Sequence, residues 1–191
     1  RPAYVMANAG LSVSYGELEA VSNQIAHLFR DLGLRRGDSI ALCLENHRTF
    51  FQICWAAHRS GIYFTAISYR LQADEVEYIV NDCDAKILIT SVHLEETFNA
   101  FKDKLVNKPA CYMLDGTTQG ASSFEDAIKT YPTEQIADQS YGQSLLYSSG
   151  TTGMPKGVKK PMVDIPWAEP DPVFEARRIR YEFDEDTIYL S

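Results

Sequence analysis

Short apolar runs alternate with amphipathic stretches of helical period along most of this 191-residue chain. The runs are too short and too apolar for exposed helices, and they are typical of strands buried on both faces. Between them, apolar residues recur three or four positions apart, as on one face of a helix. Strands that alternate with helices predict βαβ units, so we expect an α/β fold with a mainly parallel sheet flanked by helices. The expected strands are 39–44, 62–67, 85–90, 110–114 and 143–147, and the expected helices are 15–32, 47–60, 73–82 and 93–106.

Capping residues mark where several of these helices begin. Ser14 and Glu17 have the spacing of a capping box, in which each side chain bonds the other residue's backbone N–H. A second box, Ser122 and Glu125, predicts a short helix further along the chain. Asn46 is expected to cap the helix that follows it, because a short amide side chain can accept from the first free N–H groups.

The stretch 147–158 reads YSSGTTGMPKGV and is suited to chemistry rather than to packing a core. Its glycines let backbone N–H groups converge on one point, and its hydroxyl groups add further donors there. Lys156 supplies a positive point charge. Because the stretch follows an expected strand, it lies where ligands gather in parallel sheets, at the carboxyl end. We therefore predict a phosphate-binding loop.

Two common phosphate loops do not fit this stretch. The P-loop requires G-x-x-x-x-G-K-[ST], but counting from Gly150 places Pro155 at its second glycine, and Gly157 follows the lysine. The dinucleotide pattern G-x-G-x-x-G is also missing. A plain flexible linker would have no reason to carry the sequence PKGV.

Composition narrows the class of protein. The formal net charge of -8 argues against general nucleic-acid binding, and no apolar run reaches membrane-spanning length. The four cysteines form no C-x-x-C pair, so we expect buried, reduced thiols in a cytoplasmic protein. The four histidines are scattered, and we expect no metal site from them. The chain begins with Arg1 instead of Met, and the natural start is expected to lie further upstream.

The pattern of strands alternating with helices is not expected to continue after the loop. Four prolines between 161 and 172 predict an extended segment, with Trp167 either exposed or docked. A helix is expected over 173–180 and a strand over 187–190. The arginines of that helix lie close to acidic residues, which favours a solvated, self-paired face over an anion site; they are Arg177, Arg178 and Arg180, beside Glu175, Glu182 and Asp184.

The loop resembles that of the adenylate-forming, or AMP-binding, superfamily, whose usual form is [YF]-[TS]-S-G-T-T-G-x-P-K-G-V. The likeness covers nearly the whole chain. Residues 12–18 (SVSYGEL) are similar to the family's T-Y-x-E-L stretch, and 32–41 (LGLRRGDSIA) to its G-x-x-x-G-D-x-V-A stretch. Within this superfamily, the sequence most resembles bacterial fatty-acyl-CoA ligases. Two departures are the absence of proline at Ala66 or Ile67, and GVKKP at 157–161 in place of G-V-x-x-[ST]-H.

The resemblance implies an ATP-dependent acid–CoA ligase. In that family a carboxylic acid attacks the α-phosphorus of Mg-ATP, giving an acyl adenylate, and the thiol of CoA then takes the acyl group. The implied cofactors are ATP and Mg²⁺, with CoA as co-substrate and a carboxylic acid, expected to be a fatty acid, as substrate. The residues that would hold the ATP phosphates are Ser148, Ser149, Gly150, Thr151, Thr152, Gly153 and Lys156.

The resemblance also implies a domain division. Residues 1–143 would be a βαβ subdomain of the large N-terminal domain, and 144–191 the phosphate loop with the start of the next subdomain. The family's Y-G-x-T-E stretch with its magnesium-binding glutamate, its ribose-binding aspartate and its C-terminal domain do not occur in this sequence. We therefore expect no catalytic residue and no metal ligand within the chain, an inactive isolated chain, and a tendency to self-associate.

Two alternatives stay open at this point. The chain could be a non-catalytic nucleotide-binding module, or part of an adenylation domain that serves a carrier protein instead of CoA. The sequence does not distinguish among carboxylic acids of different chain length or ring character.

Overall fold

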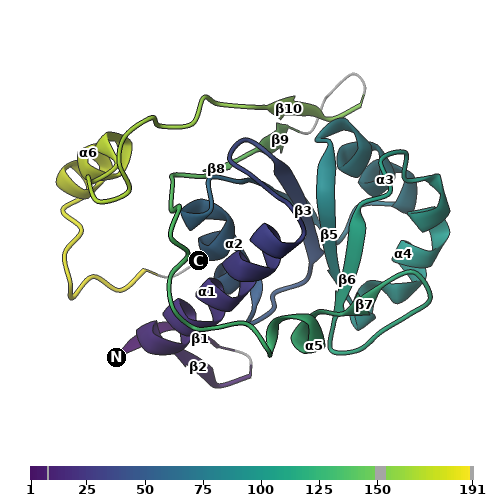
Figure 1. Cartoon of the computed structure of the whole chain (residues 1–191), viewed down its shortest axis with the longest axis horizontal. Helices are drawn as coiled ribbons and strands as arrows, with labels where there is room; N and C mark the ends of the chain where they lie inside the picture. Colours follow the sequence, from purple (N-terminus) through teal and green to yellow (C-terminus); the bar gives the residue numbers. More distant parts are fainter. Residues whose placement is uncertain (8, 149–153, 190–191) are drawn as a thin grey trace.

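A six-stranded parallel sheet forms the centre of the computed structural model, which describes residues 1–7, 9–148 and 154–189 (Figure 1). The strand order is β7-β6-β5-β3-β4-β8, and every neighbouring pair is parallel, which confirms the predicted α/β class. The sheet strands are β3 (Ser39–Leu44), β4 (Tyr63–Ser68), β5 (Ala85–Ser91), β6 (Ala110–Leu114), β7 (Ser122–Ser123) and β8 (Gln143–Ser144). The helices are α1 (Tyr15–Asp31), α2 (Phe50–Arg59), α3 (Ala73–Asp82), α4 (Glu95–Phe101), α5 (Phe124–Ile128) and α6 (Pro172–Arg180). Short 3₁₀ turns, η1 (Val92–Leu94) and η2 (Lys102–Lys104), flank α4.

Helices cover both faces of this sheet because side chains of each strand point alternately to either side. On β3, Ile40 and Leu42 belong to the core beneath α1, α2 and α5, whereas Ala41 and Cys43 belong to the core beneath α3 and α4. All six residues of β3 are buried, which explains why all but the first, Ser39, are apolar. Figure 1 shows α1 and α2 on one side of the sheet and α3 and α4 on the other.

Helix starts agree only partly with the capping predictions. The Ser14–Glu17 capping box is confirmed at the start of α1. The prediction for Asn46 was wrong, because α2 begins at Phe50 after Thr49, and the intervening chain forms a turn. The second box was also wrong. Ser123, not the residue before it, caps α5, and it accepts from the N–H of Asp126.

Other segments also differ from expectation. The strand predicted over 143–147 divides at Leu145 into β8 and β9 (Leu146–Ser148), because the chain leaves its sheet partner there. Thr187–Tyr189, the described part of the last expected strand, is irregular. Two antiparallel pairs were not predicted: β1 (Pro2–Met6) with β2 (Leu11–Ser14), and β9 with β10 (Lys156–Val158).

A buried arginine at the end of α2 joins that helix to the first half of α1. Arg59 is 2% exposed, and its Nη1 and Nη2 donate to the Glu19 carboxylate at 3.0 and 2.6 Å. Nη1 also donates to the side-chain oxygen of the buried Asn23. This pairing lowers the pKa of Glu19 from 4.5 to about 2, chiefly through the hydrogen bonds from Arg59. The pair therefore fixes how the first two helices pack.

Acid is expected to remove the stabilisation from this pair. Because the folded-state pKa of Glu19 lies below its ordinary value, the stabilisation is complete above about pH 4.5 and is lost as the pH falls toward 2. The Glu19 side chain is 43% exposed, so we expect a screened effect of about 1–2 kcal/mol. Urea unfolding of the wild type and of Glu19→Gln measures it. The difference in unfolding free energy between them should shrink across this pH interval, and a constant difference would contradict the prediction. Glu175→Gln, at an exposed pair with Arg178, is the control.

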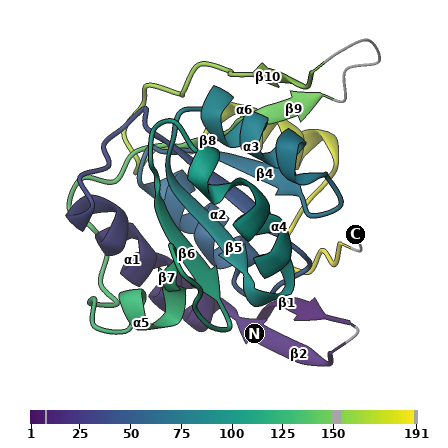
Figure 2. The ribbon, with the colours of Figure 1, turned by 90° about the vertical axis from the view of Figure 1, so that its right-hand side faces the viewer.

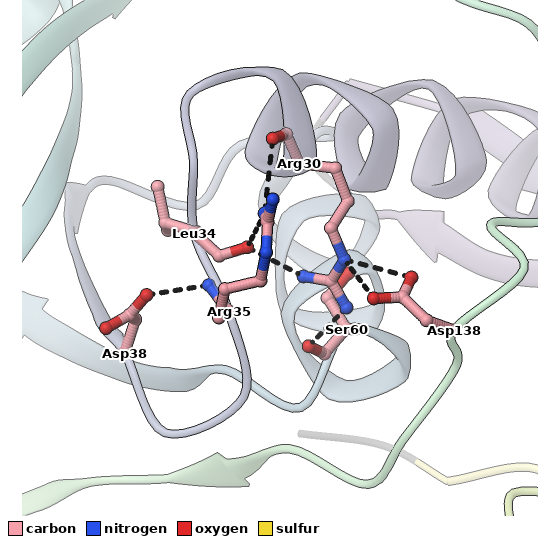
Figure 3. A network of polar contacts seen from close by, with 6 residues as sticks. All are labelled: Arg30, Leu34, Arg35, Asp38, Ser60 and Asp138. Atoms are coloured by element: carbon pink, nitrogen blue, oxygen red, sulfur yellow. Dashed lines mark hydrogen bonds and ion pairs between the residues drawn. The ribbon is translucent and has the colours of Figure 1, made fainter.

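The connecting segment, residues 129–142 between α5 and β8, is held against α1 by polar contacts (Figure 3). Arg30 of α1 donates from Nε to both oxygens of Asp138, at 3.0 and 2.9 Å. Its other nitrogens donate to the carbonyls of Leu34 and Ser60 at 3.2 and 2.9 Å. One side chain thus joins the end of α1, the end of α2 and the segment that leads into β8.

A glycine lies where the connecting segment crosses the end of α2. A Cβ on Gly142 would lie 2.4 Å from the Ala57 carbonyl oxygen and 2.5 Å from that of Ile62, both backbone atoms that cannot turn aside. The Gly142 N–H also donates to the His58 carbonyl at 2.6 Å. The close approach of these two backbones therefore requires glycine.

Gly142→Ala should consequently destabilise the protein by about 2–3 kcal/mol through steric overlap. Denaturant unfolding measures the change. The matched control is Gly16→Ala in α1, where the new Cβ has only the Ser14 Oγ nearby, at 3.9 Å. That variant should be unchanged or up to about 1 kcal/mol more stable, because alanine favours helix. Equal stability of the two variants would show that the segment moves freely away from α2.

Candidate functional site

The chain that leads to the predicted loop begins beside the first residues of β4 and runs toward the carboxyl end of that strand. β8 pairs in parallel with β4, and the Leu145 N–H then donates to the Phe64 carbonyl at 2.9 Å. Leu145 is buried, which anchors the chain before it turns outward as β9. The loop therefore follows the end of a parallel strand, where ligands bind in such sheets. Figure 2 shows the β9–β10 pair at the top of the sheet, near α3.

The two ends of the loop face each other in an antiparallel pair. The register places Ser148 opposite Lys156 and Tyr147 opposite Gly157. The structure thus brings together the first and last of the predicted phosphate-binding residues, both exposed. The other five, 149–153, lie outside the described residues. The phosphate-binding roles of all seven stay predictions.

A tyrosine fixes this pair of strands to α3. The Tyr147 hydroxyl donates to the Asp82 carboxylate at 2.5 Å, and burial together with this hydrogen bond raises the pKa of Tyr147. A Cβ on Gly157 would lie 2.9 Å from the Tyr147 ring, so glycine lets the ring lie against β10. Asp82 is the last residue of α3, where a negative charge is unfavourable with the helix dipole. Its contact with Tyr147 offsets that cost. Sequence reasoning missed this pair because nothing in the sequence links positions 65 residues apart.

A groove of about 500 Å³ lies between α3 and the loop residue Met154. The walls of this groove carry carboxylates that would repel a phosphate. We therefore expect an anion to bind near Lys156 of the β9–β10 pair and not in this groove. The lining residues are Asp74, Glu77, Tyr78, Asn81, Asp82 and Met154.

Two basic residues in the chain after the loop have partners. The Lys159 Nζ lies 4.4 Å from the centre of the Tyr63 ring, a cation–π contact. In α6, Arg178 pairs with Glu175 at 3.0 Å, which agrees with the self-paired interpretation for this one arginine of the three. Lys156 lies nearest to the loop in sequence, and we regard it as the main candidate for phosphate binding.

No three His, Cys, Asp or Glu side chains converge on a possible metal site in the described ranges 1–7, 9–148 and 154–189. The described residues therefore supply no set of three protein ligands for the Mg²⁺ that the family resemblance implies. Across the same residues, no helix combines the length and the apolar character needed to cross a membrane. All four cysteines are free, and Cys43 and Cys83 are buried.

Comparisons with known proteins agree with this arrangement. A long-chain-fatty-acid–CoA ligase, FadD13 of Mycobacterium tuberculosis, is 28% identical over 159 residues, covering 82% of this chain and 31% of the ligase. A fatty acid–[acyl-carrier-protein] ligase, ScoC of Streptomyces coeruleorubidus, is 29% identical over 78% of this chain and 28% of its own length. The crystal structure of the anthranilate CoA ligase AuaEII with anthranoyl-AMP superimposes with a TM-score of 0.75 at 27% identity, over 83% of this chain and 31% of that one.

The chain thus spans about a third of the length of these relatives. The family model described as AMP-binding enzyme matches residues 1–161, which include all seven predicted phosphate-binding positions. With this match over most of its length, the chain belongs to the AMP-binding enzyme family.

Proposed function

We propose that this chain supplies the phosphate-binding part of an ATP-dependent acid–CoA ligase that activates a carboxylic acid, foremost a fatty acid. The observation that carries the proposal is the β9–β10 pair, which sets Ser148 opposite Lys156 at the carboxyl edge of the sheet. Membership of the AMP-binding family and the fatty-acid ligases among its relatives support it.

The proposed chemistry has two steps. A carboxylate oxygen of the acid bonds to the α-phosphorus of ATP, and the bond to the β-phosphate oxygen breaks, releasing pyrophosphate. The thiolate sulfur of CoA then bonds to the acyl carbon, and AMP leaves. Both steps balance without an external oxidant or reductant.

This chain's residues would act on the leaving pyrophosphate. Ser148, Ser149, Gly150, Thr151, Thr152, Gly153 and Lys156 would hold the β- and γ-phosphates. Hydrogen bonds to a charged group each contribute about 1.5–3 kcal/mol, so several together orient the leaving group and stabilise its developing charge. Mg²⁺, when bound, would neutralise phosphate charge through ligands from elsewhere in the complete protein. The isolated chain is therefore proposed to be inactive.

Acid-dependent exchange of labelled pyrophosphate into ATP tests the first step. The complete protein that contains this sequence should catalyse the exchange with one class among fatty acids of different length and aromatic acids. The isolated chain 1–191 is the control and should not. Exchange by the isolated chain would overturn the proposed inactivity, and ATP binding without exchange by the complete protein would favour a non-catalytic nucleotide-binding module.

A carrier protein is the second candidate acyl acceptor, because one relative is a ligase for the acyl-carrier protein. Supplying CoA or a phosphopantetheinylated carrier protein in turn distinguishes the two. Thioester formed only on the carrier would replace CoA as the acceptor and leave the adenylation step intact.

A further inference from the structure

The chain that follows the phosphate loop lies across the edge of the domain instead of extending freely. We call residues 159–171 the strap, since they run from β10 to the start of α6 along β8 and the end of α2 (Figure 1). The family match ends at residue 161, so most of the strap lies beyond it.

The first part of the strap is held by the ends of β4 and β8. The Tyr63 hydroxyl donates to the Lys160 carbonyl at 2.7 Å, and the Lys159 ammonium lies over the same ring. The Gln143 amide donates to the Pro161 carbonyl at 3.1 Å. These contacts begin one residue after β10, so they hold the chain directly after that strand.

The middle of the strap is held from two sides. Met162 packs on the apolar core between the sheet and α3. Arg36, in the turn before β3, donates to the Val163 carbonyl at 2.8 Å and lies 3.5 Å from the Asp164 carboxylate. Because Asp164 is fully exposed, the backbone contact is the stronger of the two.

The last part of the strap is held by an aromatic box formed by Trp55, His58, Tyr141 and Trp167. The Trp167 ring lies 4.8 Å from the Tyr141 ring and 5.7 Å from the His58 ring, centre to centre. The nearly buried Tyr141 donates its hydroxyl to the Glu169 carbonyl at 2.5 Å, and the Trp167 carbonyl lies 3.3 Å away. One tyrosine therefore contacts both the ring and the backbone of the strap.

His58, the member of the box on α2, is held by a backbone contact. The His58 Nδ1 lies 3.0 Å from the Gly142 carbonyl, on the glycine that crosses α2. Burial lowers the pKa of His58, which keeps its ring neutral between the Asp171 and Arg59 charges. A neutral ring in a fixed orientation packs edge-on against aromatic partners.

We propose that the strap is a positioning element for the phosphate loop: by holding the chain after β10 at these three places, it fixes β10 against β9, and Tyr141 is its main positioning residue. The effect on nucleotide binding rests on the proposed function, whereas the effect on β10 does not. A tail that merely covers the surface would leave β10 unchanged when released.

Tyr141→Phe tests the proposal, because it removes the hydroxyl and keeps the ring. In the complete protein, hydrogen–deuterium exchange of the strap and β10 amides should accelerate at least threefold, and the Kd for Mg-ATP should rise about three- to tenfold, as for one lost hydrogen bond. Trp167→Ala, which empties the box from the strap side, should act in the same direction. The matched control is Tyr131→Phe, which removes a similar hydroxyl contact, 2.8 Å to Asp31, away from the loop. It should change neither quantity.

The outcomes separate the two proposals. Faster exchange in the strap with unchanged β10 exchange and unchanged Mg-ATP affinity would overturn the positioning role and leave the proposed function standing. Unchanged exchange in both segments would also overturn it. Faster exchange in β10 in a protein that does not bind Mg-ATP would support the positioning role and refute the proposed function.

Discussion

Arg59→Ala is expected to lower the free energy of unfolding by about 3–4 kcal/mol, because it breaks a buried ion pair from its buried side. The Arg59 side chain is 2% exposed, so its removal leaves a cavity. It also leaves the side-chain oxygen Oδ1 of the buried Asn23 without the donor Arg59. Truncating a large core side chain and stranding a polar atom both destabilise. Water reaches the partly exposed Glu19 carboxylate, which keeps the loss toward the lower end of that range.

Denaturant unfolding at neutral pH measures this loss. Arg178→Ala removes an exposed arginine from an ion pair with Glu175, and it should change stability by less than about 0.5 kcal/mol. Arg59→Met keeps much of the apolar volume and should recover part of the loss. A double-mutant cycle with Glu19→Gln isolates the pairwise energy. If Arg59→Ala and Arg178→Ala were equally stable, the buried pair would have no structural role.

The parallel sheet was predictable from the sequence because local patterns determine it. A strand buried on both faces, such as β3, is apolar at nearly every position, and helices that cover it have to be apolar on one face. By contrast, nothing local marks Arg59 as buried. Charged residues at the end of a helix are usually exposed, and its partner Glu19 lies 40 positions earlier.

Local sequence patterns also could not show that a strand changes its pairing partner partway along. Residues 143–147 look like a continuous strand, but the chain pairs with β4 up to Leu145 and with β10 after it. The short β1 strand escaped prediction because it shows no clear alternation of apolar and polar residues. β2 does alternate, but it has only four residues and ends at the cap of α1, which hid it as a strand. Asn46 has a suitable side chain for a cap, yet His47 accepts from the Thr49 N–H and the helix begins later.

The sequence predicts which residues form the candidate site, but it does not predict the tertiary contacts that hold them in place. The motif itself names the residues from Ser148 to Lys156, and the strand before it gives the location. The Tyr147–Asp82 contact and the aromatic box depend on tertiary packing between segments far apart in sequence. We propose that these supporting contacts hold the ends of the loop in the geometry that phosphate binding would require.

Lys156→Ala in the complete protein is expected to lower the rate of acid-dependent ATP–pyrophosphate exchange about 100-fold. Removing one preorganised donor from a developing oxyanion typically costs 10²–10³-fold in rate. In the proposed function, the Lys156 ammonium would be the donor that stabilises the charge developing on the leaving pyrophosphate. The loss should therefore fall mainly on kcat, with a smaller effect on the KM for ATP.

Lys156→Arg separates charge from geometry. A guanidinium keeps the positive charge but presents a planar fork instead of a compact ammonium, so we expect only partial recovery. The matched control is Lys129→Ala, which removes a lysine paired with Asp126 on the exposed surface and should leave exchange unchanged. Exchange by Lys156→Ala at the wild-type rate would remove the lysine from the phosphate site. A rise in KM alone, with kcat preserved, would show that Lys156 binds ATP equally in the ground state and the transition state, and would reduce its role to substrate capture.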